Sequence, residues 1–228
     1  MKKGFTLAEV LMTLGIIGVV AALTTPALIQ NTGDAKIGPR LLKAKTTFET
    51  ATEMMLTKDG YTAMTAISKD PEVIGNRLRN YMKIDRIEHA NKGNFSYKKY
   101  DGTEIPASDI DVSESGNYKF GIRYDSNDGV IYYISVFNIS PNATPYNQSV
   151  GKVIVDINGA QGPNTVAKDT FFFTLFNDGT LKPTGGYWQD SSHWNHPDPR
   201  NQCNEKNVGN DTYCAGSIFD NGMKIIYQ

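Results

Sequence analysis

The first part of the chain is almost entirely apolar. Between Phe5 and Leu23 the only charged residue is Glu9. As a helix that rises about 1.5 Å per residue, this segment is roughly 28 Å long, which is close to the hydrocarbon thickness of a bilayer. The pattern therefore predicts an N-terminal helix that is long enough to span a membrane.

The following residues have the spacing of an amphipathic helix. Apolar side chains recur three and four positions apart, with polar residues between them, at Leu41, Ala44, Phe48, Ala51 and Met55. Lys58 and Gly60 supply a last-turn cation and a C-terminal glycine. We therefore expect one long helix from Phe5 to Thr57.

Two zones weaken this helix. Pro26 lacks a backbone donor and crowds the preceding turn, which predicts a kink just before it. Residues 31–33 end in a glycine and residues 38–39 are Gly-Pro, and both residue types are unfavourable in a helix interior. Bending or local melting is expected there.

Beyond the long helix the pattern changes from helical to strand-like. Asp70-Pro71 is a typical helix start and predicts a second helix from Pro71 to Met82. From Phe95 onward, alternating residues and turn residues predict strands, which makes the fold class α+β. One strand is expected around residues 119–124, and after the turn at 125–129 a central strand follows from Val130 to Phe137. Further strands are expected at Lys152 to Ile157, at Thr170 to Phe176 before the hairpin turn at 177–179, and at Gly222 to Tyr227.

Three explanations compete for the N-terminal segment. A secretory signal peptide has an apolar core of about 7–15 residues, whereas this core is longer and carries a carboxylate. A plain membrane anchor fits the length but leaves Glu9 unexplained, because an acid deep in a bilayer costs about 2.5–3.5 kcal/mol. The third explanation rests on residues 2–9, Lys-Lys-Gly-Phe-Thr-Leu-Ala-Glu, which closely resemble the leader of type IV pilin-like proteins. We favour this third explanation.

The resemblance implies specific processing. Gly4 would end the leader, a prepilin peptidase would cleave after it, and Phe5 would become an N-methylated N-terminus. Glu9 would be the acidic residue of the family that acts in assembly. Gly18 and Pro26 also stand where many pilins have a glycine and a helix-kinking proline, whereas Ala8 departs from the larger aliphatic residue that is commoner there.

The resemblance also implies a domain organisation and a class of function. The expected parts are a leader at 1–4, a transmembrane and assembly half-helix at 5–29, an amphipathic half-helix at 30–57 and an α+β head at 58–228, whose antiparallel sheet packs on the helix. The chain would be a single-pass protein of the bacterial inner membrane, with its head outside the cytoplasm. It would then become a subunit of a type IV pilus, a competence pilus or a type II secretion pseudopilus.

The partners implied are other pilin or pseudopilin subunits, the prepilin peptidase and N-methyltransferase, and membrane lipid. The alternative function is a minor or tip subunit that acts as an adhesive or partner-binding module. Its contact would be made by the long surface loop predicted from Gly185 to Tyr213, which contains several aromatic residues and two histidines, His193 and His196. An aromatic surface loop is the interpretation favoured for this pair over a metal site.

Cys203 and Cys214 are the only cysteines. A head outside the cytoplasm would lie where disulfides form and persist, so pairing is expected over two unpaired thiols. Many type IV pilins close a C-terminal loop with such a bridge, and this pair lies similarly near the end of the chain.

One loop offers a candidate calcium site. Asp156, Asn158 and Asp169, with Asn164 between them, carry the hard oxygen ligands that calcium takes. The same residue types are typical of turns, and the turn interpretation is favoured. No cofactor is therefore expected, and calcium bound at this loop is the alternative.

Composition and motifs argue against two other classes of function. Lys and Arg number 23 against 24 Asp and Glu, without the basic stripe that nucleic-acid binding requires. The sequence has no H-E-x-x-H, no G-x-S-x-G and no glycine-rich phosphate loop. We expect neither nucleic-acid binding nor enzymatic activity.

Overall fold

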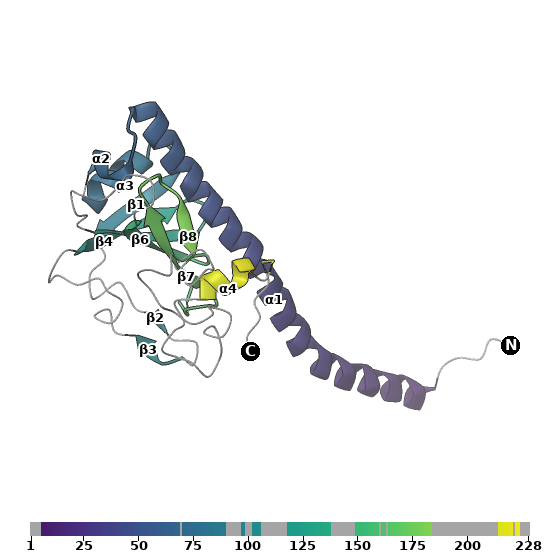
Figure 1. Cartoon of the computed structure of the whole chain (residues 1–228). Helices are drawn as coiled ribbons and strands as arrows, with labels where there is room; N and C mark the ends of the chain where they lie inside the picture. Colours follow the sequence, from purple (N-terminus) through teal and green to yellow (C-terminus); the bar gives the residue numbers. More distant parts are fainter. Residues whose placement is uncertain are drawn as a thin grey trace. The chain divides into compact units, whose positions relative to one another are not determined.

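The computed structural model describes residues 6–68, 70–89, 97–98, 102–105, 118–137, 149–159, 161–162, 164–183, 214–220 and 222–223. By internal contacts the chain divides into two compact units, Met1–Lys36 and Ile37–Gln228. One helix, α1 (Leu7–Asp59), contributes residues to both units (Figure 1). The second unit, called the head below, contains the second half of α1 together with all the strands described.

The helix α1 is continuous where the sequence predicted bending or local melting. Residues 25–40 are all α-helical, so the local melting is wrong, while the predicted kink at Pro26 stays a prediction. Helix propensity is a weak preference that tertiary contacts override. Gly38 is an example, because it is buried and a Cβ at this position would overlap the backbone carbonyl of Met223. This glycine permits a close contact with the end of the head.

The second half of α1 is amphipathic, as predicted. The five residues of the apolar stripe, each at most 2% exposed, are Leu41, Ala44, Phe48, Ala51 and Met55. The helix ends at Asp59, two residues beyond the predicted end, where Gly60 has a φ of 75°. The N–H of Tyr61 donates to the carbonyl of Leu56 at 2.8 Å, which is the hydrogen bond that closes a Schellman motif.

Two short helices follow α1. The first, α2 (Met64–Ile67), was not predicted, since four residues are too few for a periodic signal. The second, α3 (Pro71–Leu78), starts as predicted: the Asp70 carboxylate accepts from the N–H of Glu72 at 3.0 Å. It ends four residues before the predicted Met82, because residues 79–82 continue as hydrogen-bonded turns that place Met82 in the core.

The head contains a six-stranded antiparallel sheet, which confirms the predicted α+β class. Its strand order is β1-β4-β5-β6-β7-β8, and a separate two-stranded sheet pairs β2 with β3. The bounds are β1 Ile84–His89, β2 Tyr97–Lys98, β3 Glu104–Ile105, β4 Tyr118–Ser126, β5 Ile131–Phe137, β6 Ser149–Asp156, β7 Thr170–Phe176 and β8 Leu181–Pro183. The predicted β4–β5 and β7–β8 hairpins and the central position of β5 are confirmed, whereas β1 was not predicted.

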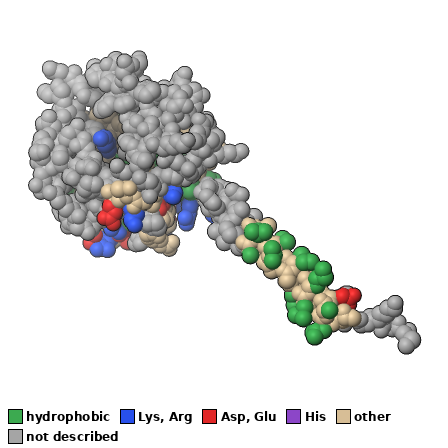
Figure 2. Space-filling model, turned by 90° about the horizontal axis from the view of Figure 1, so that it is seen from below, with side chains coloured by type: hydrophobic (Ala, Val, Ile, Leu, Met, Phe, Trp, Pro, Cys, Tyr) green, Lys and Arg blue, Asp and Glu red, His purple; other side chains and the backbone are tan. Residues whose placement is uncertain are grey.

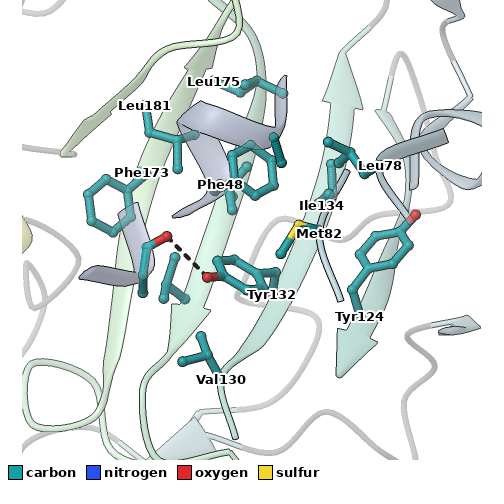
Figure 3. Packing of buried hydrophobic residues seen from close by; sticks show 14 of the residues in the cluster. Phe48, Leu78, Met82, Tyr124, Val130, Tyr132, Ile134, Phe173, Leu175 and Leu181 are labelled. Atoms are coloured by element: carbon teal, nitrogen blue, oxygen red, sulfur yellow. Dashed lines mark hydrogen bonds between the residues drawn. The ribbon is translucent and has the colours of Figure 1, made fainter. Parts of the chain in front are cut away.

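One face of this sheet packs against the apolar stripe of α1 and against α3. Figure 3 shows Phe48 of α1 among side chains of several strands, near Phe173, Leu175 and Leu181. The ring of Phe48 lies 5.6 Å from that of Tyr132, and the Tyr132 hydroxyl donates to the Ala44 carbonyl at 3.0 Å. These contacts join the helix to the middle of the sheet, so this face forms the main core.

The opposite face of the sheet carries a smaller cluster. Because side chains alternate across a strand, residues next in sequence to the core residues point to this second face. They pack there with two residues from outside the six strands, and the cluster consists of Tyr97, Ile131, Tyr133, Ile154, Val166 and Phe172. The sheet is therefore buried on both faces near its centre.

The C-terminal part differs from the prediction. A helix, α4 (Cys214–Asp220), follows the predicted loop, and its Phe219 ring lies 6.1 Å from that of Phe173. The strand predicted from Gly222 to Tyr227 is wrong at its start, because Gly222 and Met223 have φ angles of 65° and 67° and form a turn. The N–H of Met223 donates back to the Ile218 carbonyl at 2.8 Å. Residues 224–228 lie outside the described part.

Candidate functional site

The apolar segment at the start of α1 is exposed throughout its described side chains. Leu7–Thr24 is long and apolar enough to cross a membrane, and none of these residues is buried within the chain. Its terminal leucines, Leu7 and Leu23, are 78% and 75% exposed. Figure 2 shows hydrophobic side chains along this segment and an acidic group near its end. Such a surface requires an apolar environment that the segment itself does not provide.

Glu9 lies in the first turn of α1 and closes a capping box with Thr6. One carboxylate oxygen of Glu9, Oε2, accepts from the N–H of Thr6 at 2.8 Å and from its hydroxyl at 2.7 Å. In return, the N–H of Glu9 donates to Oγ1 of Thr6 at 3.3 Å. Donors at a helix start lack intrahelical acceptors, and this reciprocal pair satisfies two of them. No other described residue forms a hydrogen bond with the Glu9 carboxylate.

The partnership with Thr6 was not foreseen from the sequence. The signal for it is present, because Thr6-Leu7-Ala8-Glu9 matches the T-x-x-E pattern of a capping box before an apolar run. It was overlooked because Glu9 was considered only as an isolated charge. The capping box gives Glu9 a structural role at the helix start in addition to any role between subunits.

The loop between β6 and β7 brings the predicted calcium candidates together. Oδ1 of Asp156 accepts from the N–H groups of Asn158 and Gly159 at 3.1 and 2.9 Å, which is the turn geometry predicted for these residue types. The side-chain amide of Asn158 donates to Oδ2 of Asp169 at 3.2 Å. Oδ1 of Asp169 accepts from the N–H of Thr165, in the same loop, and from the hydroxyl of Thr170, the first residue of β7.

Both carboxylates of this loop are buried. Asp156 has no exposed surface and Asp169 is 9% exposed. Burial, together with the negative charge of Asp169, raises the pKa of Asp156 to about 7. Burial likewise raises the pKa of Asp169, although its hydrogen bonds oppose the shift. In the described part of the chain no three His, Cys, Asp or Glu residues gather as a metal site, so any cation here would depend on amide oxygens as well.

The other acidic turn, at residues 125–129, is accounted for by contacts within the chain. Asp125 receives two hydrogen bonds from Arg123, at 2.6 and 2.9 Å. Asp128 forms an ion pair with Lys43 of α1 at 3.2 Å. The turn interpretation of this segment therefore fits its geometry.

Comparison with known proteins bears on the N-terminal segment. Residues 1–25 match the family model described as the prokaryotic N-terminal methylation motif. On an apolar N-terminal helix, this motif fits a type IV pilin-like or pseudopilin chain. No curated protein and no solved structure matches the chain. The similarity to type IV pilin-like proteins therefore rests on residues 1–25, and the head is described by its own fold alone.

A pilin-type motif indicates a structural subunit, a class of protein that generally has no enzymatic activity. It also implies processing by a peptidase and assembly with other pilin subunits. The processing residues themselves, Gly4 and Phe5, lie outside the described residues, and no side chain is described at Pro26.

The predicted C-terminal features are only partly described. Cys214 begins α4, is 3% exposed and is not a free thiol. Cys203 lies outside the described residues, so its pairing with Cys214 stays a prediction. The segment Gly185 to Tyr213, with His193 and His196, also lies outside them, and the adhesive alternative stays a prediction as well.

Proposed function

We propose that this chain is a subunit of a type IV pilus-like or type II secretion filament, assembled through the first half of α1 after removal of the leader. The observation that carries this proposal is the exposed apolar helix Leu7–Thr24, in which Glu9 is the only charge. A helix that is apolar on all sides needs lipid or other apolar helices around it. A membrane-anchored precursor and a filament each supply one of these environments.

The subunit would start in the bacterial inner membrane, with its head outside the cytoplasm. A prepilin peptidase would cleave between Gly4 and Phe5, and Phe5 would be N-methylated. Extraction into the filament would then exchange lipid contacts for contacts with neighbouring helices. Since both environments are apolar, the exchange needs little change in buried area, and specific polar contacts would decide how adjacent subunits fit together.

Glu9 is the side chain suited to make such a polar contact between adjacent subunits. Its Oε2 is engaged by Thr6, but a carboxylate has about four lone-pair sites and can accept further hydrogen bonds. A neighbouring subunit would bring the Phe5 amine, a cation, beside it. In an apolar environment an unpaired charge is unfavourable, whereas a hydrogen-bonded pair offsets much of the desolvation. Glu9 would therefore set the axial register between subunits.

The experiment has to separate this charge pairing from the capping box. Glu9→Gln serves this purpose, because glutamine also occurs at this position of a capping box but carries no charge. It would leave the neighbour's amine without a counter-charge, at a cost of about 3–5 kcal/mol. We expect Glu9→Gln and Glu9→Ala to reduce incorporation into sheared filaments more than tenfold, measured by immunoblot against whole-cell protein.

Thr6→Ala is the matched control. It removes the capping hydroxyl, at a cost of about 1 kcal/mol, and keeps the carboxylate, so filaments should still form in reduced amount. All three variants should still be cleaved and inserted in the membrane. Incorporation of Glu9→Gln at the wild-type level, in cells without other subunits that could rescue it, would refute the pairing and leave Glu9 with the capping role alone.

A further inference from the structure

The connection between β6 and β7 contains buried side-chain oxygen atoms that accept no hydrogen bond from the described residues. The two ends of this connection lie side by side, because Asp156 pairs with Thr170 across the strands and the N–H of Ile157 donates to the Asp169 carbonyl at 2.8 Å. Asn158 and Asn164 lie within the connection itself. Four oxygen-bearing side chains are thus gathered by one loop at one end of the sheet.

Three of these side chains have an oxygen without a hydrogen-bond donor. Oδ2 of Asp156, Oδ1 of Asn158 and Oδ1 of Asn164 are buried and accept no hydrogen bond from any described residue. An unpaired oxygen is least favourable in Asp156, because the whole residue has no exposed surface. Buried polar atoms in native proteins are nearly always paired, so three unpaired acceptors in one loop point to a partner beyond the described residues.

Other contacts of these three residues, two through the side chain and one through the backbone, hold the residues in place. Oδ1 of Asp156 is fixed by the N–H groups of Asn158 and Gly159, which leaves Oδ2 as its free acceptor. The amide nitrogen of Asn158 is fixed by Asp169, which leaves its Oδ1 free. The backbone of Asn164 is tied down because its carbonyl accepts from the N–H of Lys98 at 2.8 Å. The loop is therefore organised before any ligand arrives.

We propose that this loop binds one calcium ion, with Asp156, Asn158 and Asn164 as side-chain ligands. All three offer oxygen, the donor that calcium takes, and none offers the nitrogen or sulfur that zinc prefers. Calcium accepts irregular geometry and six to eight ligands, so neutral amide oxygens and water complete its shell readily, whereas magnesium requires a near-octahedral site. The buried negative charge of the loop favours a divalent cation.

Asp169 is a positioning residue rather than a ligand. Both of its oxygens accept hydrogen bonds, from Thr165 and Thr170 at Oδ1 and from Asn158 at Oδ2. It orients the amide of Asn158 and adds a second negative charge. The sequence had grouped Asp169 with Asp156 and Asn158 as equivalent candidates, and the hydrogen bonds distinguish their roles.

Calcium binding would also affect the segment that packs on the second face of the sheet. The residues after Asn164 join β2, since Val166 donates to the Lys98 carbonyl at 2.9 Å, and they carry Val166 into the smaller cluster with Tyr97. A calcium ion bound by Asn164 would therefore add a further contact to the segment that covers this face of the head.

The test uses the full-length protein in detergent, stripped with EDTA and then titrated with calcium chloride by calorimetry. We expect one saturable site per chain, with a dissociation constant of about 10⁻³ M or below, as in extracellular calcium modules. The thermal midpoint should rise with calcium by mass action. No saturable binding, or an equal response to magnesium chloride, would overturn the proposal.

Asn164→Ala is the most informative variant, because it removes an oxygen that pairs with nothing described while keeping the backbone contact to Lys98. Without calcium it should be at least as stable as wild type. With calcium it should bind at least about tenfold more weakly and gain less in thermal midpoint. Asp156→Asn keeps the turn acceptor for Asn158 and should lose affinity similarly.

Asp178→Asn is the matched control. This exposed aspartate accepts from the N–H of Thr180 at 3.0 Å in the β7–β8 turn, so the substitution makes the same chemical change outside the proposed site. Its calcium affinity should equal that of wild type. Retention of wild-type affinity by Asn164→Ala, or equal losses in Asp178→Asn and Asp156→Asn, would show that these oxygens do not bind the ion.

Discussion

Gly75 in α3 provides a sharp test of how the helices pack on the sheet. It is buried, and a Cβ at this position would overlap the ring of Tyr124 on β4. Tyr124 is 1% exposed, and its hydroxyl donates to the Pro71 carbonyl at 2.6 Å. Figure 3 shows Tyr124 of β4 and Leu78 of α3 among the buried residues of the main core. The ring therefore has little space in which to move away.

Two opposing effects decide the result of Gly75→Ala. Alanine is favoured over glycine inside a helix by about 0.5–1 kcal/mol. Overpacking of a well-filled core costs about 1–3 kcal/mol, and a displaced Tyr124 would also leave the Pro71 carbonyl or its own hydroxyl without a partner, at about 1–3 kcal/mol. The steric effect is larger, and we expect a net loss of about 2–4 kcal/mol in the free energy of unfolding.

Urea unfolding of the full-length protein in detergent, followed by circular dichroism, measures this loss. Asn76→Ala, at the exposed neighbouring position, is the control and should change stability by less than about 0.5 kcal/mol. In a Tyr124→Leu background the overlap is relieved, so Gly75→Ala should then be neutral or stabilising. A Gly75→Ala protein as stable as wild type would refute the packing of α3 on β4.

Two further predictions concern the buried half of α1 and the processing residues that precede the helix in the sequence. Phe48→Ala should destabilise the head by about 3–5 kcal/mol in urea unfolding, because Phe48 is fully buried against Tyr132, whereas Met54→Ala, at a side chain 42% exposed, should cost under about 1 kcal/mol. Equal effects would contradict the orientation of the helix on the sheet. Mass spectrometry of the mature protein should find an N-terminus at Phe5 with one methyl group, and an intact Met1 would contradict processing at Gly4.

The parts of the head that could be predicted are those with a regular period or a strong turn. The stripe from Leu41 to Met55 follows the helical spacing, and Asn177-Asp178-Gly179 specifies a hairpin through a glycine with a φ of 85°. The missed strand β1 has a physical explanation. A bulge between Ile84 and Arg86 shifts its register, so Ile84 and Ile87 both contact the core although they are three residues apart. A search for alternation cannot find such a strand.

The candidate sites, like the strands, could be predicted only where the signal is local in the sequence. Glu9 was identified because a single charge in an apolar segment needs a reason, and that signal is local. The unpaired oxygens of Asp156, Asn158 and Asn164 depend on burial by the rest of the head, which no local pattern records. Helix α4 was missed for a similar reason, since seven residues have little intrinsic helicity and its Phe219 is held by Phe173.

Effects on assembly and effects on head stability can be measured separately because they depend on different contacts. Glu9 contacts Thr6 in the first turn of α1, whereas Phe48 packs on Tyr132 of the sheet, and the two residues share no partner in the described part of the chain. Substitutions without shared partners are additive to within about 0.5 kcal/mol. Glu9→Gln should therefore leave the unfolding of the head unchanged and, combined with Phe48→Ala, should add nothing to the loss of stability. A failure of Glu9→Gln to assemble could then be attributed to the lost charge, since an unfolded head would have been visible in the same measurement.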